Sequence, residues 1–546
     1  MSAWRSQLPR SLSLLLLTAV VVLLSACGGA TSTPSKSNNS STPATNQVLR
    51  FPNVGTADIG KLDPASGPDA NSNQAVNMIF SGLVRADQNL KAQPDQATSW
   101  DVSKDNRVYT FHLRNDITFS DGTPITAQSY VYTWTRALLP EVKSPVGPVL
   151  EEAIQGASDV INGKTKTLTG VKALDDHTLQ VTLVRPTSYF LQLLTVSMFR
   201  PLNQKVIEQY GQTDWVNHVA GSAIGSGPFM VKSWQHGVKM VFAPNPHYYG
   251  KKTQLKEVQM SFVNDASTAF KAYQAGQYDL VWGLTTNDQL QAQSMPGFVR
   301  KPVLESDLLF FNNKMAPFDK TAVRQAFAAA INKQALAKTI FHDTVTPAST
   351  IIPPGMPGSQ ADYPGIPFNP DKAKSLLKSA YPDVSKIPPI TFSYPSSQVT
   401  PELAEALQQM WQDNLGVKVK LNSVELTSYN AETTKRTIQF GFTQWGVYFP
   451  DPYEWLDLSL LSNSANNNGN WSNPQFDQTV AQAEQTSGDA RLALYAKAER
   501  IAIDNVGWLP IDHQSAAAII PSKIHGVTMN SNGLYFGDWS DVYLTK

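Results

Sequence analysis

The feature that most constrains this chain is its first apolar run, Leu12 to Ala26. The run has 15 residues and follows a basic segment that contains Arg5 and Arg10. A helix of this length is too short to cross a hydrocarbon layer of about 30 Å. A short apolar run behind basic residues is typical of a secretory signal peptide, which is removed from the mature protein. We therefore predict a signal peptide at residues 1–26 and an exported protein beyond it.

The apolar run ends in the sequence LSAC, which contains Cys27, the single cysteine of the chain. This ending resembles the lipobox of bacterial lipoproteins, in which the cysteine becomes the first mature residue and carries lipid. One cysteine cannot form an intramolecular disulfide, so a free thiol in an exported protein needs another purpose. Lipidation supplies one, because two acyl chains hold a protein to a membrane far more firmly than one. The alternative is a plain signal peptide cut after Ser25-Ala26, followed by a chance cysteine.

The segment behind the cysteine, residues 28–47, contains no large apolar side chain. Such a composition cannot bury enough surface to fold, so we predict a lipidated Cys27 and a flexible tether over residues 27–47. No later apolar run is long enough for a transmembrane span. We expect the protein at the outer face of a bacterial cytoplasmic membrane, held there by lipid.

Charge and length bound the classes of function. The chain has 44 basic and 44 acidic residues, and its leader contains two of the basic ones, Arg5 and Arg10, and no acid. This balance predicts no basic patch, and therefore no nucleic acid as a partner. The roughly 500 residues that follow the leader exceed one hydrophobic core, so we expect two or three domains.

Strand and helix patterns alternate from the start of the body. The alternation of apolar and polar residues predicts a strand over 108–113, and a helix begins behind Thr126 as its N-cap. Residues 171–183 have the pattern of a hairpin, strand–turn–strand. The apolar residues of the segment 73–87 have helical spacing, with Gly82 near its end.

The second half continues the same pattern. Residues 225–250 predict two strands joined around Gly237, and residues 265–283 predict a helix, a stop at Gly276 and a short apolar strand. Residues 308–313 are typical of a buried strand. Interleaved strands and helices, with hairpins in the first half, predict mixed α/β lobes joined by more than one crossing of the chain.

The sequence resembles a known family, the large solute-binding proteins of peptide-type ABC importers, extracellular family 5. The similar segments occur in the family's order and cover nearly the whole chain after the tether; they include LDPA (62–65), IFSGLV (79–84), GSGPFMVKSW, AYQAGQYDLV, FDKTAVRQAFAAAINK and RLALYAKAERIAIDN. The resemblance implies a three-lobed α/β fold, periplasmic-binding-protein-like, type II and of the large peptide-binder class, with a ligand cleft between lobes. It implies lobe I from residues 48–80, 206–298 and 516–546, lobe II from residues 81–205, and lobe III from residues 299–515.

The stretch WGVYFPDPYEW, residues 445–455, contains five aromatic residues and two prolines. The prolines exclude a regular helix or a central strand there. Rigid aromatic faces bury a large area at low entropic cost and tolerate varied ligand side chains. In the resembling family this segment lines the cleft, and Trp445 matches a tryptophan common there. The alternative is a buried aromatic plug at a lobe boundary; Phe449 and Trp455 are the residues that we expect in the core.

Three positions depart from the residues that hold ligand in the family's oligopeptide binders. Tyr448 stands where an aspartate pairs with the ligand's amino group, Val146 replaces a tyrosine, and Leu426 replaces a tryptophan. The recognition of a free N-terminus is therefore in question. The candidate ligand-binding residues are Trp445, Gly446, Val447, Tyr448, Asp451, Leu426, Val146 and Arg436.

Two of these candidates have alternatives. Asp451 could replace the missing charge, or serve the structure, as an acid near this position often does in the family. Arg436 could meet a ligand carboxylate, or be a solvated surface arginine.

Motifs of catalysis are missing from the sequence. The eight histidines form no HExxH motif, and neither GxSxG nor GxxxxGK[ST] occurs. The sequence SLLK at 375–378 has the SxxK spacing of penicillin-recognising enzymes, but it lies in a lysine-rich helix and neither SDN nor KTG occurs. We therefore expect no enzyme, no cofactor and no protein-held metal. A histidine-based metal chelate in the cleft stays open, because some members of the resembling family carry nickel complexes.

The resemblance and these residues together predict a function. We expect a monomeric, lipid-anchored receptor that captures peptides or peptide-like solutes outside the cell and delivers them to the permease and ATPase subunits of an ABC importer by hinge closure. The alternatives are a sensory peptide receptor that uses the same cleft and a surface hydrolase.

Overall fold

The computed structural model describes residues 43–546, except Val146 and Tyr448. The predicted signal peptide, Cys27 and the tether as far as residue 42 lie outside the described residues. So do two of the candidate ligand residues, Val146 and Tyr448.

The first sheet has four strands in the order β1 (Val48–Val54), β10 (Glu257–Val263), β9 (Lys239–Pro244) and β8 (Phe229–Gln235). β1 is parallel to β10, and the other two pairings are antiparallel. Gly237 turns the β8–β9 hairpin with a φ of 72°, so the predicted pair of strands is confirmed. A core cluster joins this sheet to α1 (Ala70–Ile79) and α6 (Gln204–Tyr210).

The second sheet is antiparallel, in the order β4 (Ala97–Val102), β5 (Val108–Leu113), β7 (Thr178–Thr182) and β6 (Val171–Asp175). The strand over 108–113 and the hairpin over 171–183 are confirmed. Helix α2 (Ala127–Leu138) covers the sheet, and its Tyr130 and Trp134, four residues apart, are fully buried. Beside them lie β2 (Val84–Ala86), β3 (Ala92–Pro94), α3 (Gly147–Ala153), α4 (Ala157–Ile161) and α5 (Phe190–Leu193).

The helix predicted within 73–87 ends earlier than its apolar spacing indicates. α1 stops at Ile79, and Phe80 is extended, with φ −129° and ψ 140°. Other segments take over the carbonyl groups at this helix end. Gly227 N donates to Ile79 O at 3.0 Å, and Arg200 Nη1 donates to the carbonyls of Val76 and Phe80. Long-range hydrogen bonds therefore end the helix and free residues 84–86 for strand β2.

The third sheet contains the strands in the order β11 (Val281–Trp282), β17 (Leu509–Ile519), β12 (Phe298–Phe311), β16 (Phe440–Gly446), β14 (Ile390–Pro395) and β15 (Val419–Val424), and β13 (Thr346–Pro347) pairs with β17. α7 (Ala266–Gln274) precedes β11, as predicted for residues 265–283. The buried strand predicted at 308–313 is the end of β12, which begins ten residues earlier, at Phe298.

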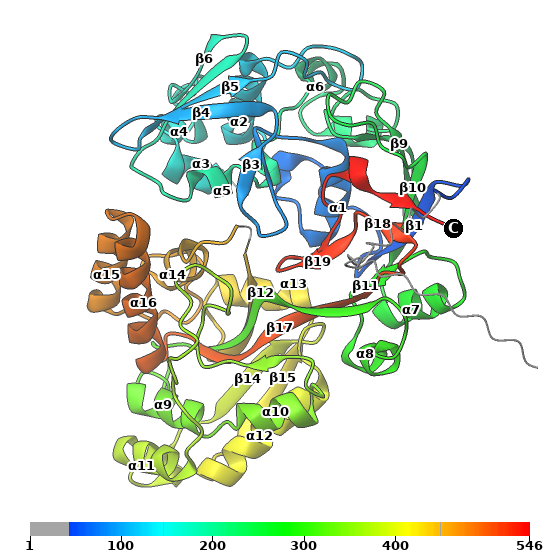
Figure 1. Ribbon diagram of the computed structural model, residues 1–546. Coiled ribbons are helices and arrows are strands. Elements are labelled where there is room, and N and C mark those ends of the chain that lie inside the picture. Colours follow the sequence, from blue (N-terminus) through cyan, green and yellow to red (C-terminus); the bar gives the residue numbers. More distant parts are fainter. Residues whose placement is uncertain (1–42, 146, 448) are drawn as a thin grey trace, which may run out of the picture. The chain divides into compact units, whose positions relative to one another are not determined.

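Helices cover both faces of the third sheet (Figure 1). Leu309 and Phe311 of β12 pack in one core cluster with α9 (Thr321–Ala329), α11 (Pro370–Ala380) and α12 (Pro401–Leu415). Leu308 and Phe310, which alternate with them, pack in another with α13 (Leu426–Thr434), α14 (Tyr453–Leu460), α15 (Pro474–Glu484) and α16 (Gly488–Asp504). α8 (Thr286–Ala292) and α10 (Lys333–Thr339) complete the α-helices of the described residues.

Two long strands belong to more than one core. β12 and β17 pair from Phe298–Ile519 to Leu309–Leu509. Near one end, Ala518 packs in the cluster of the first sheet; near the other, Leu309 and Leu509 pack in the cluster of α9 and α12. The lobe boundaries that we expect at 298/299 and 515/516 therefore fall at the start of β12 and within β17. Figure 1 shows these strands side by side.

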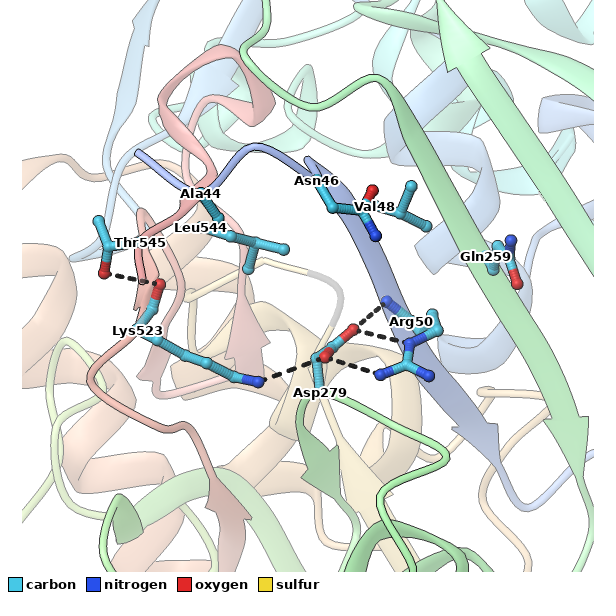
Figure 2. Close-up of a pocket in the computed structure, with 9 residues that line it drawn as sticks. All are labelled: Ala44, Asn46, Val48, Arg50, Gln259, Asp279, Lys523, Leu544 and Thr545. Carbon is cyan, nitrogen blue, oxygen red and sulfur yellow. Dashed lines mark hydrogen bonds and ion pairs between the residues drawn. The ribbon is translucent and has the colours of Figure 1, made fainter. Parts of the chain in front are cut away.

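The C-terminal tail folds back against the start of the body. It contains β18 (Ile524–His525), β19 (Thr528–Asn530), β20 (Gly533–Tyr535) and β21 (Tyr543–Leu544), which the sequence analysis missed. Gln47 and Leu544 exchange two hydrogen bonds, and Ala44 N also donates to Leu544 O. Residues 43–47, the last of the predicted tether, are therefore part of the folded body. Beside them is a cavity of about 500 Å³, in which Asp279 is hydrogen-bonded by Arg50 and Lys523 (Figure 2).

Candidate functional site

Three neighbouring parallel strands end at one edge of the third sheet. β14 pairs in parallel with β15 and with β16, so the carboxyl ends of all three lie on the same side. Trp445 and Gly446 are the last residues of β16 and Val447 follows it, while Leu426 opens α13 two residues after β15 ends. Ligands of open α/β sheets bind at such carboxyl edges. The structure thus brings together four of the candidate ligand residues.

Trp445 closes the loop between β16 and α14. Its indole Nε1 donates to Glu454 O at 2.9 Å, and its ring lies 5.8 Å from the ring of Trp508. The side chain is half-buried. Gly446 beside it is exposed, and a Cβ there would meet no atom closer than 3.6 Å. The edge therefore offers one fixed aromatic face beside one exposed glycine.

The two ends of the aromatic stretch are regular, contrary to the prediction: the central strand β16 includes Trp445 and Gly446, and α14 begins at Tyr453, directly after the second proline. The other aromatic side chains of the stretch are buried where they are described. Phe449 and Tyr453 stack on Tyr189, with ring centroids 5.3 and 4.9 Å away. Both side chains belong to the core cluster of the second sheet, although in the sequence they come directly after β16, a strand of the third sheet. Trp455 is fully buried in the cluster of α14 to α16. The prediction that Phe449 and Trp455 are core residues is confirmed.

Asp451 is held by an arginine. Arg491 Nη1 and Nη2 donate to its two carboxylate oxygens at 2.7 and 2.8 Å, and both side chains are buried. Arg491 Nη2 also donates to Glu484 at 3.2 Å. A bidentate, buried pair of this kind is a strong structural contact. The ligand role of Asp451 stays a prediction. Both oxygens of its carboxylate already accept hydrogen bonds from Arg491.

Arg436 lies at the other end of β16 from Trp445. It precedes the strand with a φ of 55°, and its guanidinium donates to Ser464 O at 2.8 Å and to Asn470 Oδ1 at 3.4 Å. The structure does not bring it together with the edge residues, and its role toward a ligand carboxylate stays a prediction.

Buried titratable groups gather on the same strands, and the sequence analysis missed them. Asp307 of β12 lies opposite Gln444 of β16 and Asp512 of β17. Gln444 and Gln514 donate to its carboxylate at 3.0 and 2.9 Å. Burial, together with the nearby charge of Glu305, raises the pKa of Asp307 to about 7. Burial and the charge of Asp307 raise the pKa of Asp512 well above its usual range.

A lysine accompanies these acids. Lys333 Nζ donates to Ala348 O at 2.8 Å, and burial lowers its pKa to about 7. The signal that could have revealed the cluster is the placement of acids inside otherwise apolar strands, in ESDLLFF and LPIDHQ. Acids are seldom fully buried unless they are paired, so such positions indicate a polar network.

A serine–histidine pair lies on the opposite face of these strands. Ser306 Oγ and His513 Nδ1 are 2.7 Å apart, and Ser306 Oγ also donates to Ile351 O. Ser306 is fully buried, and burial lowers the pKa of His513 to about 3. A nucleophile must reach its substrate and its base must take up a proton. This buried pair meets neither requirement and is structural.

The fold and the edge together define a class of protein. The strands β12 and β17 of the third sheet extend from its own core to the core of the first sheet. The candidate residues lie at an edge of this third sheet, and binding proteins that hold a solute between lobes have such an arrangement. Residues 91–467 match the model of the bacterial extracellular solute-binding proteins, family 5 middle, and the chain belongs to this family.

Named relatives cover nearly the whole chain. The oligopeptide-binding protein OppA of Bacillus subtilis is 30% identical over 492 residues, which cover 87% of this chain and 89% of the relative. The probable deoxycholate-binding periplasmic protein YgiS of Escherichia coli is 32% identical over 505 residues, which cover 90% and 93%. The relatives and neighbours are binding proteins, so this chain is a binding protein and not an enzyme, as the sequence predicts.

Solved structures show the same fold. The Escherichia coli murein tripeptide binding protein MppA has a TM-score of 0.79 at 28% identity, over 92% of this chain and 99% of that one. Haemophilus influenzae OppA in complex with RPPGFSPFR has a TM-score of 0.76 at 25% identity, over 92% and 100%. The predicted α/β fold of the type II, large peptide-binder class is confirmed.

Two findings concern absences within residues 43–546, with 146 and 448 set aside. None of the helices in this range has both the length and the apolar character to cross a membrane. In the same range no three His, Cys, Asp or Glu side chains gather closely enough to hold a metal ion.

Proposed function

We propose that this protein captures peptides outside the cytoplasm and delivers them to an ABC import permease. The observation that carries the proposal is the match, over more than nine-tenths of the chain, to two solved structures. One is named a tripeptide binding protein, and the other is in complex with a peptide. The relative from Bacillus subtilis is likewise named an oligopeptide-binding protein. These comparisons do not favour the alternative of a sensory receptor.

The ligand site that we propose is the carboxyl edge formed by Trp445, Gly446, Val447 and Leu426, together with Tyr448 and Val146. A receptor that accepts many sequences can hold a peptide by its main chain and leave its side chains in roomy pockets. The exposed backbone at Gly446 suits the first task, and the face of Trp445 suits the second.

The mechanism that we propose is closure about β12 and β17. Ligand bound to both lobes stabilises the closed form by its higher affinity for that form, and the permease recognises the closed shape. The lobes are those expected from the sequence: residues 48–80, 206–298 and 516–546; 81–205; and 299–515. The protein acts as a monomer, and partner subunits hydrolyse the ATP.

Lipid on Cys27 and the tether hold the receptor near its permease at high effective concentration. A Cys27→Ser variant tests the anchor, because it should leave the membrane fraction. Its recovery with the membranes in the same proportion as the wild type would show that lipid on Cys27 is not the anchor.

A second ligand class has an observation of its own, the 32% identity to a probable deoxycholate-binding protein. Tyr448, in place of an acid, also removes the charge expected for a peptide amino group. An amphipathic carboxylate with a large apolar body is therefore the second candidate ligand, bound at the same edge.

Three measurements separate these candidates. Native mass spectrometry of protein purified without refolding identifies any ligand that it retains. Calorimetric titration then compares pools of short peptides with deoxycholate, and small-angle scattering measures the radius of gyration with each. We expect heat and compaction with peptides and neither with deoxycholate. Heat with deoxycholate alone would favour the second class, and no retained ligand, heat or compaction would refute solute capture by closure.

A further inference from the structure

A second cavity lies away from the carboxyl edge, between segments of the second and third sheets. Its volume is about 550 Å³, within the usual range of small-molecule sites. Arg185 and Pro186, which follow β7, form one wall, and residues of α14 and α15 form the others. The cavity is therefore lined by two parts of the chain that are far apart in sequence.

Two arginines beside the cavity are already used. Arg491 binds both oxygens of Asp451 and one oxygen of Glu484. Arg185 binds the other oxygen of Glu484. The carboxylates of Asp451 and Glu484 thus account for both guanidinium groups.

Asp457 is the carboxylate left over. It lines the cavity, its residue is 6% exposed, and its Oδ2 has no hydrogen-bond partner in the part of the chain that the structure describes. Tyr495 is hydrogen-bonded to this carboxyl group, but Asp457 forms no ion pair among the described residues. A buried carboxylate without an ion pair is costly, so such a group takes up a proton or a counter-cation. The cavity provides room for the cation.

The remaining walls decide what kind of cation fits. Pro186, Leu461, Val480 and Ala481 present hydrocarbon to the cavity. A bare metal ion requires several oxygen ligands close together, and no three acidic, histidine or cysteine side chains of the described residues are grouped in that way. A cationic head with an apolar body satisfies Asp457 and covers the hydrocarbon.

We propose that this cavity is a binding site for an organic ammonium group with an apolar body, held by Asp457. The same chemistry belongs to a free alkylamine and to the lysine side chain of a captured peptide. The site lies outside the proposed carboxyl-edge site, and the free-amine form does not depend on the proposed function.

Proton linkage gives the site a signature. Burial raises the pKa of Asp457 to about 8 when the cavity is empty, so binding of an ammonium group near neutral pH must displace a proton. The groups that face Asp457 are Arg491, Asp451, Arg185, Tyr495, Tyr189 and Tyr453. Asp477 on α15 already accepts from Ser462 N and Oγ. Affinity should therefore rise roughly tenfold per pH unit as pH rises toward 8, and then level off.

The test titrates the purified protein with n-hexylammonium at pH 6, 7 and 9 in a calorimeter, with 1-hexanol and ammonium as controls. We expect one site for n-hexylammonium, tighter at pH 9 than at pH 6, and no heat from either control. Asp457→Asn keeps the shape of the side chain and should weaken binding at least tenfold. Asp477→Asn is the matched control, because it removes an acid of the same cavity, and it should bind like the wild type.

A second variant keeps the test decisive if Asp457→Asn does not fold. Ala481→Phe fills the cavity from α15, leaves Asp457 in place and should also abolish binding. The peptides Ala-Lys-Ala and Ala-norleucine-Ala separate the two sources. If the site takes a lysine side chain, Asp457→Asn should weaken the binding of Ala-Lys-Ala and leave that of Ala-norleucine-Ala unchanged. If the site takes a free amine, n-hexylammonium should bind to the protein while either peptide is bound.

The proposal is overturned if n-hexylammonium gives no heat at any pH, or binds Asp457→Asn as tightly as the wild type. Peptide capture that survives in Asp457→Asn leaves the proposed function standing in either case. If the wild type binds no peptide, the proposed function is refuted, but the proposal of a free-amine site is unaffected.

Discussion

Asp307 and Asp512 lie directly opposite each other on β12 and β17, the two strands that cross between the cores. Both side chains are buried, and the register of the two strands shifts next to Asp307. Two carboxyl groups held together in this way cannot both ionise without cost, so they share a proton near neutral pH. The protonation of this pair links the pH to the strands about which we propose that the lobes close.

This pair predicts a pH-dependent stability. The pKa of Asp307 is about 7 in the folded protein against 3.8 ordinarily, so the folded state binds its proton more tightly. The contribution of the pair is full below about pH 4 and is lost at roughly 1.4 kcal/mol per pH unit for each proton as pH rises to 7. Asp307→Asn should therefore gain stability relative to the wild type between pH 5 and pH 8, measured by urea unfolding.

The control for that measurement is Asp362→Asn, which changes an exposed acid. Its difference from the wild type should be the same at both pH values. An Asp307→Asn difference that is equally independent of pH would show that the pair does not hold a proton in the folded protein.

The glycines of GSGPF predict a large effect from a small change. A Cβ on Gly225 would lie 1.9 Å from Ile79 O, where α1 ends, and backbone cannot move aside as a side chain can. Gly225→Ala should lower stability by about 1–3 kcal/mol, the usual cost of overpacking, measured as the midpoint of thermal unfolding. Gly60→Ala is the control, because a Cβ there meets no atom within 4 Å. Equal midpoints for the two variants would contradict this close approach.

The sequence predicts local elements well, because their signals are local. The strand over 108–113, the helix behind Thr126 and the hairpin over 171–183 depend on alternation, capping and turn residues within a few positions. The early end of α1 was not predictable in this way, because Arg200 and Gly227 supply the hydrogen bonds that end it.

The residues of the candidate site likewise differ in whether a local signal in the sequence could identify them. Trp445 was identified from a dense aromatic stretch and a family resemblance, both visible in the chain. The partners of Asp451 and Asp307 were not, because Arg491 and Asp512 lie far along the sequence and only the folded sheet brings them near. The four short strands of the C-terminal tail were missed because each has only two or three residues, too few for a periodic pattern.

The buried ion pairs of Arg491 lead to a prediction about the free energy of unfolding. Arg491→Met leaves Asp451 and Glu484 buried without their shared guanidinium, so we expect a loss of about 3–5 kcal/mol in the free energy of unfolding. Arg114→Met is the control: Arg114 forms a similar bidentate pair with Asp116 at the surface, and its loss should cost less than about 1 kcal/mol. Adding Asp451→Asn to Arg491→Met should restore part of the loss, since one uncompensated charge is removed. A double variant no more stable than the single one would show that the cost of Arg491→Met lies in packing.

Trp445 makes the sharpest test of the proposed ligand edge, because its contacts separate binding from stability. Trp445→Phe keeps an aromatic face but loses the hydrogen bond to Glu454 O, so we expect about 1 kcal/mol less stability and nearly unchanged ligand affinity. Trp445→Ala removes the face and should weaken binding of the retained ligand at least tenfold, measured by calorimetry. Trp282→Ala is the matched control. Trp282 lies on β11, the strand at the far edge of the same sheet, and it is also half-buried. Its indole also donates to a backbone carbonyl, Pro52 O, at 2.9 Å. The control variant should lose stability as Trp445→Ala does and bind ligand as the wild type does. If Trp445→Ala loses stability while its affinity is unchanged, Trp445 is a structural plug and the ligand edge lies elsewhere.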